Sequence, residues 1–276
     1  MKERLSIFIG YYETQKQLNR TIRSLSSGIQ KEPNIDVKIT ILDNSREKRL
    51  KANELPVGCF EHEIKPTDCE KPIHWHINDA VREDNSDYIG LCIDAARLCS
   101  SGVLEKATKE LRNDQQSIIH VPNYQLGPCM QMYAKDYGFT EEKEDALLQS
   151  VSWPECSAEN LKSISTMESH AGKNTPIFES NALFLSKQQW IQAGGYNKDF
   201  RRLDGGFASA EMLMRVLEKR PLLTIMASEG NFHQMHGGTT TKSASQTKHA
   251  IREMTREYRV IKKQIPKLYR GAIKII

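Results

Sequence analysis

The sequence lacks paired cysteines, long apolar runs and a strong excess of one charge. None of its six cysteines belongs to a Cys-x-x-Cys pair, which argues against a structural zinc site. We expect reduced thiols, because a chain of 276 residues without a secretion signal does not need disulfides. Internal repeats and low-complexity tracts are also absent, so repeat architectures are excluded.

No apolar stretch approaches the roughly 20 residues that a membrane-spanning helix needs. A net charge of +4 is too small to indicate a nucleic-acid partner, and part of the basic excess is concentrated after residue 242. The opening residues, MKERLSIFIGYY, combine a charged start with an apolar run of strand length, without a small-residue cleavage site. We interpret them as the first strand of the fold and expect a cytoplasmic protein.

An apolar run, Tyr88–Ile93, stands at the centre of the pattern. Such a run between polar segments is typical of a middle strand in a parallel sheet, covered on both faces. The strand ends on Asp94, with Arg97 three residues further, and Ser100–Ser101 are suited to cap a following helix. Ligands of open α/β sheets lie beyond the carboxyl ends of the strands. Asp94 is therefore placed either to meet a metal ion, with Arg97 near a phosphate, or to cap the next helix.

Two earlier strands, Leu5–Ile9 and Val37–Leu42, end in a similar way. A helix with apolar residues at 18, 22 and 25 separates them. The three strand ends carry Tyr11 with Tyr12, Asp43, and Asp94. Strand–helix–strand units with right-handed crossovers run parallel, so we expect these ends to meet at one crevice of an α/β domain.

Apolar spacings and breaker residues predict the other elements. Further helices are expected over residues 72–81, 103–111, 141–150, 187–193 and 209–219, and further strands over 59–64, 117–121, 182–185 and 222–227. Residues 123–138, 152–172 and 230–241 are interpreted as loops. The second of these loops is either an acceptor-site loop or a plain surface insertion.

The chain becomes basic after residue 242, and Ile251, Met254, Tyr258 and Ile261 form an apolar stripe at helical spacing. We therefore divide the chain into a domain over residues 1–242 and a basic amphipathic helical tail over 243–276. The tail either packs on the domain or mediates association. Association would mean peripheral contact with the inner membrane surface or formation of a homo-oligomer.

Several landmarks together resemble the GT-A glycosyltransferases, particularly the inverting family 2 group. They are the helix around Leu18 to Leu25, Asp43-Asn44-Ser45, Asn78, Asp94, the segment GGYNKDF at 194–200 and the segment FHQMHGG at 232–238. The resemblance covers roughly residues 5–240. It implies a Rossmann-like, mostly parallel central sheet flanked by helices.

The resemblance also implies an activity, which is transfer of a sugar, with inversion, from a UDP- or GDP-sugar to a glycan or lipid-linked acceptor. It assigns donor binding to Asp43, Asn78 and Asp94, and we add Tyr11, Tyr12, Glu13 and Arg97 from the same strand ends. It places Asp94 at the metal-binding position and residues 232–238 in a loop that closes over the donor. We therefore expect a Mn²⁺ or Mg²⁺ site at Asp94, His233 and His236, whose mixed oxygen and nitrogen ligands suit Mn²⁺.

Two motifs of the family are incomplete here. The metal-binding Asp-x-Asp is reduced to Asp94-Ala95-Ala96, for which the Arg97 guanidinium can compensate by contacting the phosphates. The Glu-Asp pair expected before the last core helix is replaced by residues 208–211, Ala-Ser-Ala-Glu. Glu211, or with less support Asp204, is then the candidate general base.

Two other interpretations remain open. A sugar nucleotidyltransferase has a related sheet, but its Gly-rich loop after the first strand is not present in Gly10–Glu13. A binding protein that has lost catalysis would explain both incomplete motifs. Turnover of a donor distinguishes such a protein from an enzyme.

Overall fold

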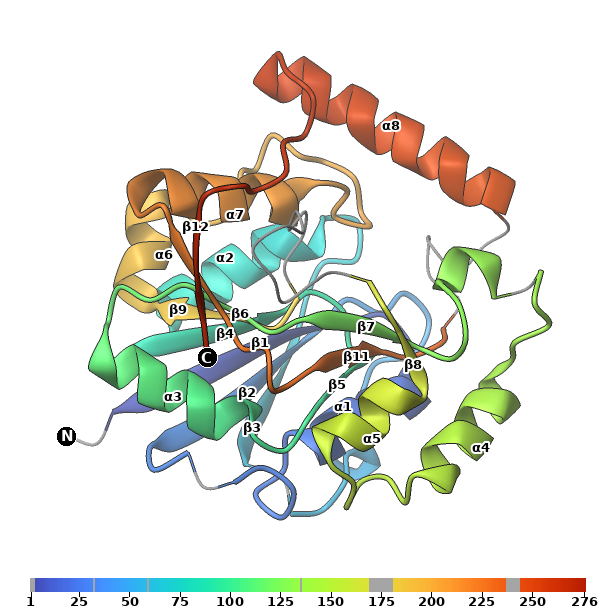
Figure 1. Ribbon diagram of the computed structural model, residues 1–276. Coiled ribbons are helices and arrows are strands. Elements are labelled where there is room, and N and C mark those ends of the chain that lie inside the picture. Colours follow the sequence, from blue (N-terminus) through green and yellow to red (C-terminus); the bar gives the residue numbers. More distant parts are fainter. Residues whose placement is uncertain (1–2, 32, 59, 135, 169–180, 237–243) are drawn as a thin grey trace.

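The computed structural model describes residues 3–31, 33–58, 60–134, 136–168, 181–236 and 244–276. An eight-stranded sheet passes through its middle, with helices on both faces (Figure 1). In spatial order the strands are β12 (Ala272–Ile275), β10 (Leu222–Ile225), β6 (Ile119–His120), β9 (Leu183–Ser186), β4 (Tyr88–Cys92), β1 (Arg4–Tyr11), β2 (Asp36–Asp43) and β3 (Glu61–Pro66). In this sheet of described strands only β9 is antiparallel to its neighbours, so the predicted mostly parallel α/β sheet is confirmed.

Two helical layers cover the sheet and enclose separate apolar clusters. The first layer consists of α1 (Gln15–Ser24) and α3 (Val103–Asn113), and the second of α2 (Ile73–Glu83), α6 (Lys187–Ala193) and α7 (Ala208–Lys219). The predicted apolar side chains Leu18, Ile22 and Leu25 are all fully buried against β1 and β2. Burial of the apolar face therefore fixes α1 where the sequence spacing placed it.

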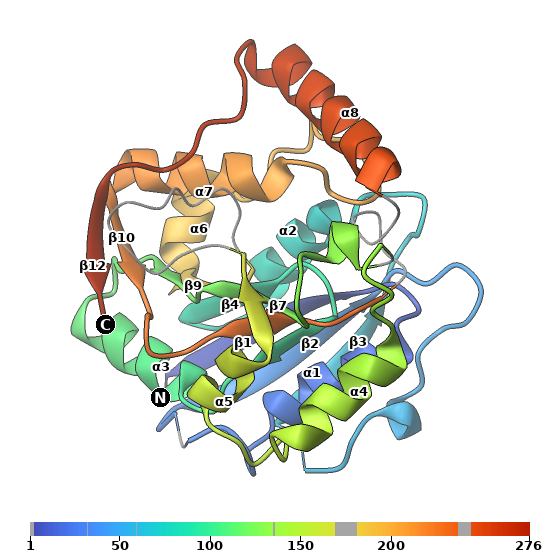
Figure 2. The same ribbon diagram turned by 45° about the vertical axis from the view of Figure 1, so that its right-hand side comes forward.

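A second, four-stranded sheet lies beside the first, and the sequence did not predict it. Its order is β5 (Arg97–Cys99), β11 (Asn231–His233), β7 (Asn123–Leu126) and β8 (Ser165–Met167), with α4 (Glu141–Ser150) and α5 (Ala158–Ser163) alongside (Figure 2). The loop interpretations of 123–138, 152–172 and 230–241 are thus wrong in these parts. Strands of three or four residues show no alternation, and partners distant in sequence determine them.

The turn after β4 differs from the expected helix start. The N-cap of α3 is Gly102, without a side-chain cap, and the Ser100 hydroxyl instead donates to Glu229 Oε2 over 2.6 Å. The buried Glu229 carboxylate also accepts from the Gly102 amide, at 3.3 Å. A distant acid therefore replaces the local serine cap.

The C-terminal segment combines a helix and a strand. Helix α8 (Ala244–Lys262) buries Met254 and Tyr258 of the apolar stripe, whereas Ile251 is exposed. Strand β12 pairs in parallel with β10, so the tail is not helical throughout. The proposed boundary at 242, Cys59, residues 169–180 and Gly237–Gly238 lie outside the described residues. Among the helices that the structure describes, none has the length and apolar character needed to span a bilayer.

His120 on β6 is completely buried, and burial lowers its pKa to about 4. In the unfolded chain an imidazole binds a proton below about pH 6.5, whereas His120 in the fold stays neutral until about pH 4. Protons therefore favour the unfolded state, and His120 removes stability as the pH falls from about 6.5 to about 4.

We predict that His120→Gln reduces the loss of unfolding free energy between neutral and acidic pH by roughly 3 kcal/mol. Urea unfolding at a series of pH values measures this difference. The exposed His62 on β3 provides the control, and His62→Gln is measured in parallel. A His120→Gln curve parallel to that of wild type would contradict the assignment.

Candidate functional site

The carboxyl ends of β1, β2 and β4 meet at one edge of the large sheet. Tyr11 and Asp43 are register neighbours, and Asp94 lies two residues beyond the end of β4. The β1 backbone approaches closely there, because a Cβ on Gly10 would lie 2.3 Å from the Ile93 carbonyl oxygen. The predicted convergence of these strand ends is therefore confirmed.

A pocket of about 190 Å³ opens at the same edge. It is lined by Tyr11, Glu13, Gln15, Glu47, Lys48, Arg49 and Glu54. The Tyr11 hydroxyl donates to Gln15 Oε1 over 3.3 Å, and burial, with the nearby Asp43 carboxylate, raises the pKa of Tyr11 to about 12. The tyrosine therefore stays protonated at the wall of the pocket.

Asp43 and Glu13 shape the loop that borders this pocket. Asp43 is fully buried, and its two carboxylate oxygens accept from the amides of Ser45 and Leu50, at 3.0 and 2.9 Å. Glu13 Oε1 accepts from the amides of Glu47 and Arg46, and these bonds hold the pKa of Glu13 below its ordinary value. Both predicted donor-binding acids thus serve as loop anchors in this structure, and a contact of either with a donor stays a prediction.

Asp94, His233 and His236 form a cluster in which one ligand atom from each lies within 4.8 Å of the others. The antiparallel pairing of β11 with β5 places His233 directly opposite Arg97. The Nε2 atoms of His233 and His236 are 2.9 Å apart. The three residues that the sequence assigned to a metal ion are therefore brought together.

The electrostatic surroundings keep this cluster in a form that suits metal binding. Burial opposes ionisation of Asp94, but the Arg97 charge outweighs it, so the pKa of Asp94 lies below its ordinary range. Arg97 Nε donates to Asp94 Oδ2 over 3.1 Å. Burial, and then the Arg97 charge, lowers the pKa of His233. An ionised carboxylate beside neutral imidazoles is the ligand form that divalent metals require.

Buried polar side chains from three other elements hold the loop between the two histidines. Gln17 of α1 donates to the Met235 carbonyl over 2.7 Å, and Glu144 of α4 accepts from the Met235 amide at 2.5 Å. Gln131, in a 3₁₀ turn (Gln131–Tyr133), donates to the Gln234 carbonyl over 2.6 Å. Sequence reasoning missed these residues, because one acid in an EEKED run gives no signal of being buried.

Tyr12 connects the strand edge to the loop that contains Asp204. Its hydroxyl donates to the Leu203 carbonyl over 3.5 Å, and burial, followed by the charges of Asp94 and Asp204, raises the Tyr12 pKa. Asp204 accepts from Arg202 through Nε at 3.0 Å and Nη2 at 2.7 Å. The Tyr12 hydroxyl therefore lies within reach of the charges of both Asp94 and Asp204.

Glu211 and Asn78 have contacts of a different kind. Glu211 is 2% exposed and accepts from Arg215 Nε at 3.0 Å and from Lys262 Nζ at 2.8 Å, so it connects α7 to α8. Burial alone would raise the pKa of Glu211, but these two cations lower it. Asn78 exchanges two hydrogen bonds with the Tyr196 backbone, at 2.8 and 2.7 Å. A catalytic role for Glu211 and a donor contact for Asn78 stay predictions.

The Asn78 bonds explain the glycines of the 194–200 segment. Gly194 ends α6 with a φ of +83°, and Gly195 follows with a φ of +65°. A Cβ on Gly195 would lie 2.4 Å from Asn78 Oδ1. Only glycine therefore lets this turn reach the Asn78 amide.

The chain matches no known family profile and no curated protein sequence. The crystal structure of S. aureus TarS matches it with a TM-score of 0.55 and 10% identity, over 94% of this chain and 40% of TarS. The structure of S. aureus TarS 1-349 in complex with UDP matches with a TM-score of 0.52 and 10% identity, over 94% of this chain and 66% of that one. This chain thus spans less than two thirds of either TarS chain. Its α/β fold with a mostly parallel central sheet is similar to that of the glycosyltransferase TarS.

Proposed function

We propose that this chain is a glycosyltransferase that takes its sugar from a nucleoside diphosphate sugar. The observation that carries the proposal is the Asp94, His233 and His236 cluster at the sheet edge that also holds the 190 Å³ pocket. The similar fold of TarS, which has been crystallised with UDP, supports a uridine nucleotide as the first donor to test. A glycan or a lipid-linked hydroxyl is the proposed acceptor.

The cluster fits a divalent cation, and Mn²⁺ in particular. Asp94 would supply one oxygen, and His233 and His236 would each supply one nitrogen, a mixed set that Mn²⁺ accepts. Diphosphate oxygens and water would fill the other positions. When bound, such an ion offsets the charge that develops on the departing diphosphate. Arg97, held against Asp94, adds a fixed positive charge on the same side.

We assign the general base to Asp204 rather than to Glu211. A base must reach the acceptor hydroxyl and needs a pKa that permits proton uptake. Glu211 is buried between two cations that stabilise its ionised form. Asp204 lies on the loop that Tyr12 joins to the strand edge. Its bond to Arg202 would have to open when the acceptor binds.

A binding protein without turnover is the second candidate. Residues 208–211, Ala-Ser-Ala-Glu, stand at the start of α7 where the GT-A family that the chain resembles has a Glu-Asp pair, and Asp94 has no second acid beside it. Hydrolysis or transfer of the donor would exclude this alternative, whereas donor binding without any turnover would establish it.

We predict that one nucleotide family stabilises the protein in the presence of Mn²⁺, by about 2.7 kcal/mol at a hundredfold excess over the Kd. Thermal shift with UDP, GDP and their sugars, with and without Mn²⁺, measures this effect. Asp94→Asn should abolish the Mn²⁺-dependent part, whereas the exposed control Asp68→Asn should retain it. Stabilisation that does not require metal would point to Arg97 alone, and no response to any nucleotide would refute the glycosyltransferase proposal.

Asp204→Asn is expected to reduce kcat by about 100-fold or more while donor affinity stays within about twofold. Glu211→Gln is expected to lower the unfolding free energy by about 3 kcal/mol, because it removes the charge of the buried carboxylate that pairs with two half-buried cations, with little change in kcat. Steady-state kinetics and urea unfolding separate the two effects. Asp199→Asn, an exposed acid in the same segment, is the matched control. The reverse pattern would assign the base to Glu211.

Glu144→Ala is expected to weaken Mn²⁺ binding by about tenfold, because the Met235 amide loses its acceptor and both histidine ligands lose their fixed positions. Isothermal titration with Mn²⁺ measures the change. Asp145→Ala is a close control, since Asp145 also pairs with Arg20 but does not bind the 234–236 loop. Equal losses in both variants would show that the Arg20 pairs, rather than the loop anchor, govern the affinity.

A further inference from the structure

Helix α8 separates its charged residues between two faces. Glu257 on the inner side accepts from the Arg201 amide over 2.9 Å, and Glu253 and Glu257 both act on the Arg202 charge. Lys262 points to Glu211 of α7. Glu257 is therefore directed toward the domain, and Glu253 lies near enough to Arg202 to act on its charge.

The outward face carries only cations among its charged side chains. They are Lys248, Arg252, Arg256, Arg259 and Lys263, all exposed. Arg252, Arg256 and Arg259 are four and three residues apart, which places them on one stripe of the helix, opposite the buried Met254 and Tyr258. Within the described residues, no acidic side chain forms a salt bridge with this stripe. It is therefore positively charged and open to solvent.

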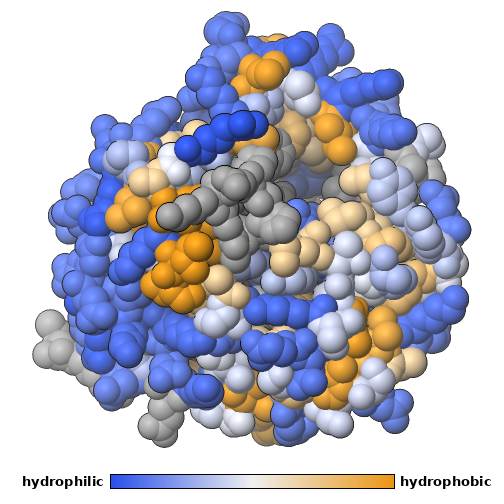
Figure 3. Space-filling model, viewed as in Figure 1, coloured by the Kyte–Doolittle hydropathy of each residue, from blue (hydrophilic) through white to orange (hydrophobic). Residues whose placement is uncertain are grey.

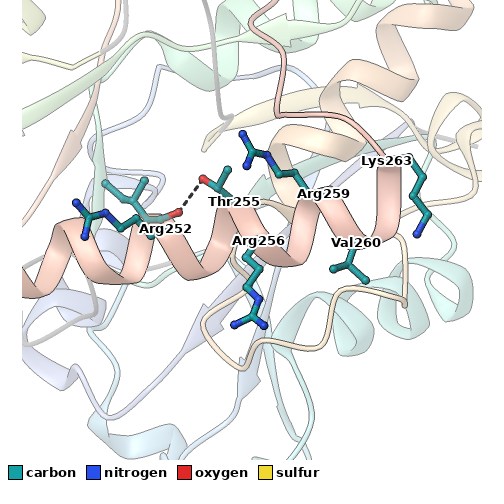
Figure 4. Close-up of a pocket in the computed structure, with 7 residues that line it drawn as sticks. Arg252, Thr255, Arg256, Arg259, Val260 and Lys263 are labelled. Atoms are coloured by element: carbon teal, nitrogen blue, oxygen red, sulfur yellow. Dashed lines mark hydrogen bonds between the residues drawn. The ribbon is translucent and has the colours of Figure 1, made fainter.

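Apolar side chains border the basic stripe on both edges. Ile251 is 38% exposed and Val260 is 63% exposed. Open space of about 630 Å³ borders this face of α8, and its lining includes Arg252, Thr255, Arg256, Arg259, Val260 and Lys263 (Figure 4). In Figure 3, α8 at the top of the molecule presents blue side chains with orange ones between them. A face of several exposed cations with few apolar side chains is typical of a basic segment that is attracted to an anionic lipid surface.

We infer that the outward face of α8 docks onto an anionic lipid bilayer. Five cations supply charge complementarity to acidic headgroups, each strengthening binding by about fivefold. The exposed Ile251 and Val260 can contact the headgroup region of a bilayer, whereas a soluble polyanion offers no apolar surface to these side chains. Both views of the ribbon place α8 farther from the central sheet than α7, so a flat surface can approach it (Figures 1 and 2).

The position of α8 links this surface to the candidate site. Its inner side binds Arg201, and the same loop continues through Leu203, which accepts from Tyr12, to Asp204. Docking through α8 would therefore bring the Asp204 side of the site near the lipid headgroups. If the proposed function holds, this arrangement favours a lipid-linked acceptor over a free glycan.

Sedimentation with vesicles tests the inference on the full chain, without nucleotide or metal. We expect binding to phosphatidylcholine–phosphatidylglycerol vesicles at about 0.1 M salt, weakening as screening increases, and none to phosphatidylcholine alone. The variant with Arg252, Arg256, Arg259 and Lys263 changed to Gln should bind at least about 100-fold more weakly. A control with four exposed cations on other elements changed to Gln has the same net charge and should retain binding; these are Lys31, Lys71, Arg82 and Lys109.

Two further measurements decide between partners. The double variant Ile251→Ser with Val260→Ser should weaken vesicle binding but leave binding to inorganic polyphosphate unchanged. Binding to polyphosphate but not to vesicles would overturn the inference and indicate a soluble polyanion as the partner. Equal losses of vesicle binding in the four-Gln variant and its control would also overturn it, because they would indicate an effect of net charge alone. Titration of the four-Gln variant with UDP and Mn²⁺ reports separately on the proposed function. Vesicle binding by a protein that binds no nucleotide would refute only that function.

Discussion

The antiparallel pairing of β5 with β11 is the contact on which the candidate site depends. It joins the turn after the central strand to a segment far along the chain and sets Arg97 opposite His233. Ser100 fixes the same ribbon, since its amide donates to the Gly230 carbonyl over 3.0 Å and its hydroxyl donates to Glu229. Without this pairing, Asp94 and the two histidines would be ordinary loop residues on separate segments.

The histidine loop illustrates how buried polar groups can specify a site. Its backbone is bound by Gln17, Gln131 and Glu144, which come from three elements and are all buried. Burying such groups is costly unless each finds a partner, and here the loop backbone provides one. The outcome is a pair of imidazoles held in position before any ligand arrives, which is what a site of defined geometry requires.

The roles of the acidic side chains in this protein differ because of their surroundings, not because of their residue type. The carboxylates of Asp43 and Glu13 accept hydrogen bonds from loop amides, whereas Glu211 forms ion pairs with Arg215 and Lys262. Asp94 remains beside two imidazoles and one guanidinium. The same side chain thus serves as a loop anchor, an inter-helix link or a candidate ligand, depending on which donors lie around it.

The sequence by itself determined the parts in which local pattern and burial coincide. The apolar run before Asp94, the helical spacing of Leu18 and Ile22, and the order of strand ends were sufficient to predict the parallel sheet and the edge at which the site lies. Only the tertiary structure decided the second sheet, the strand β12 and the anchoring roles of Glu144 and Glu211. Strands this short have the same sequence pattern as loops, and a buried acid in a charged helix has the same pattern as a solvated one. The residues that distinguish them are contact partners distant in the chain.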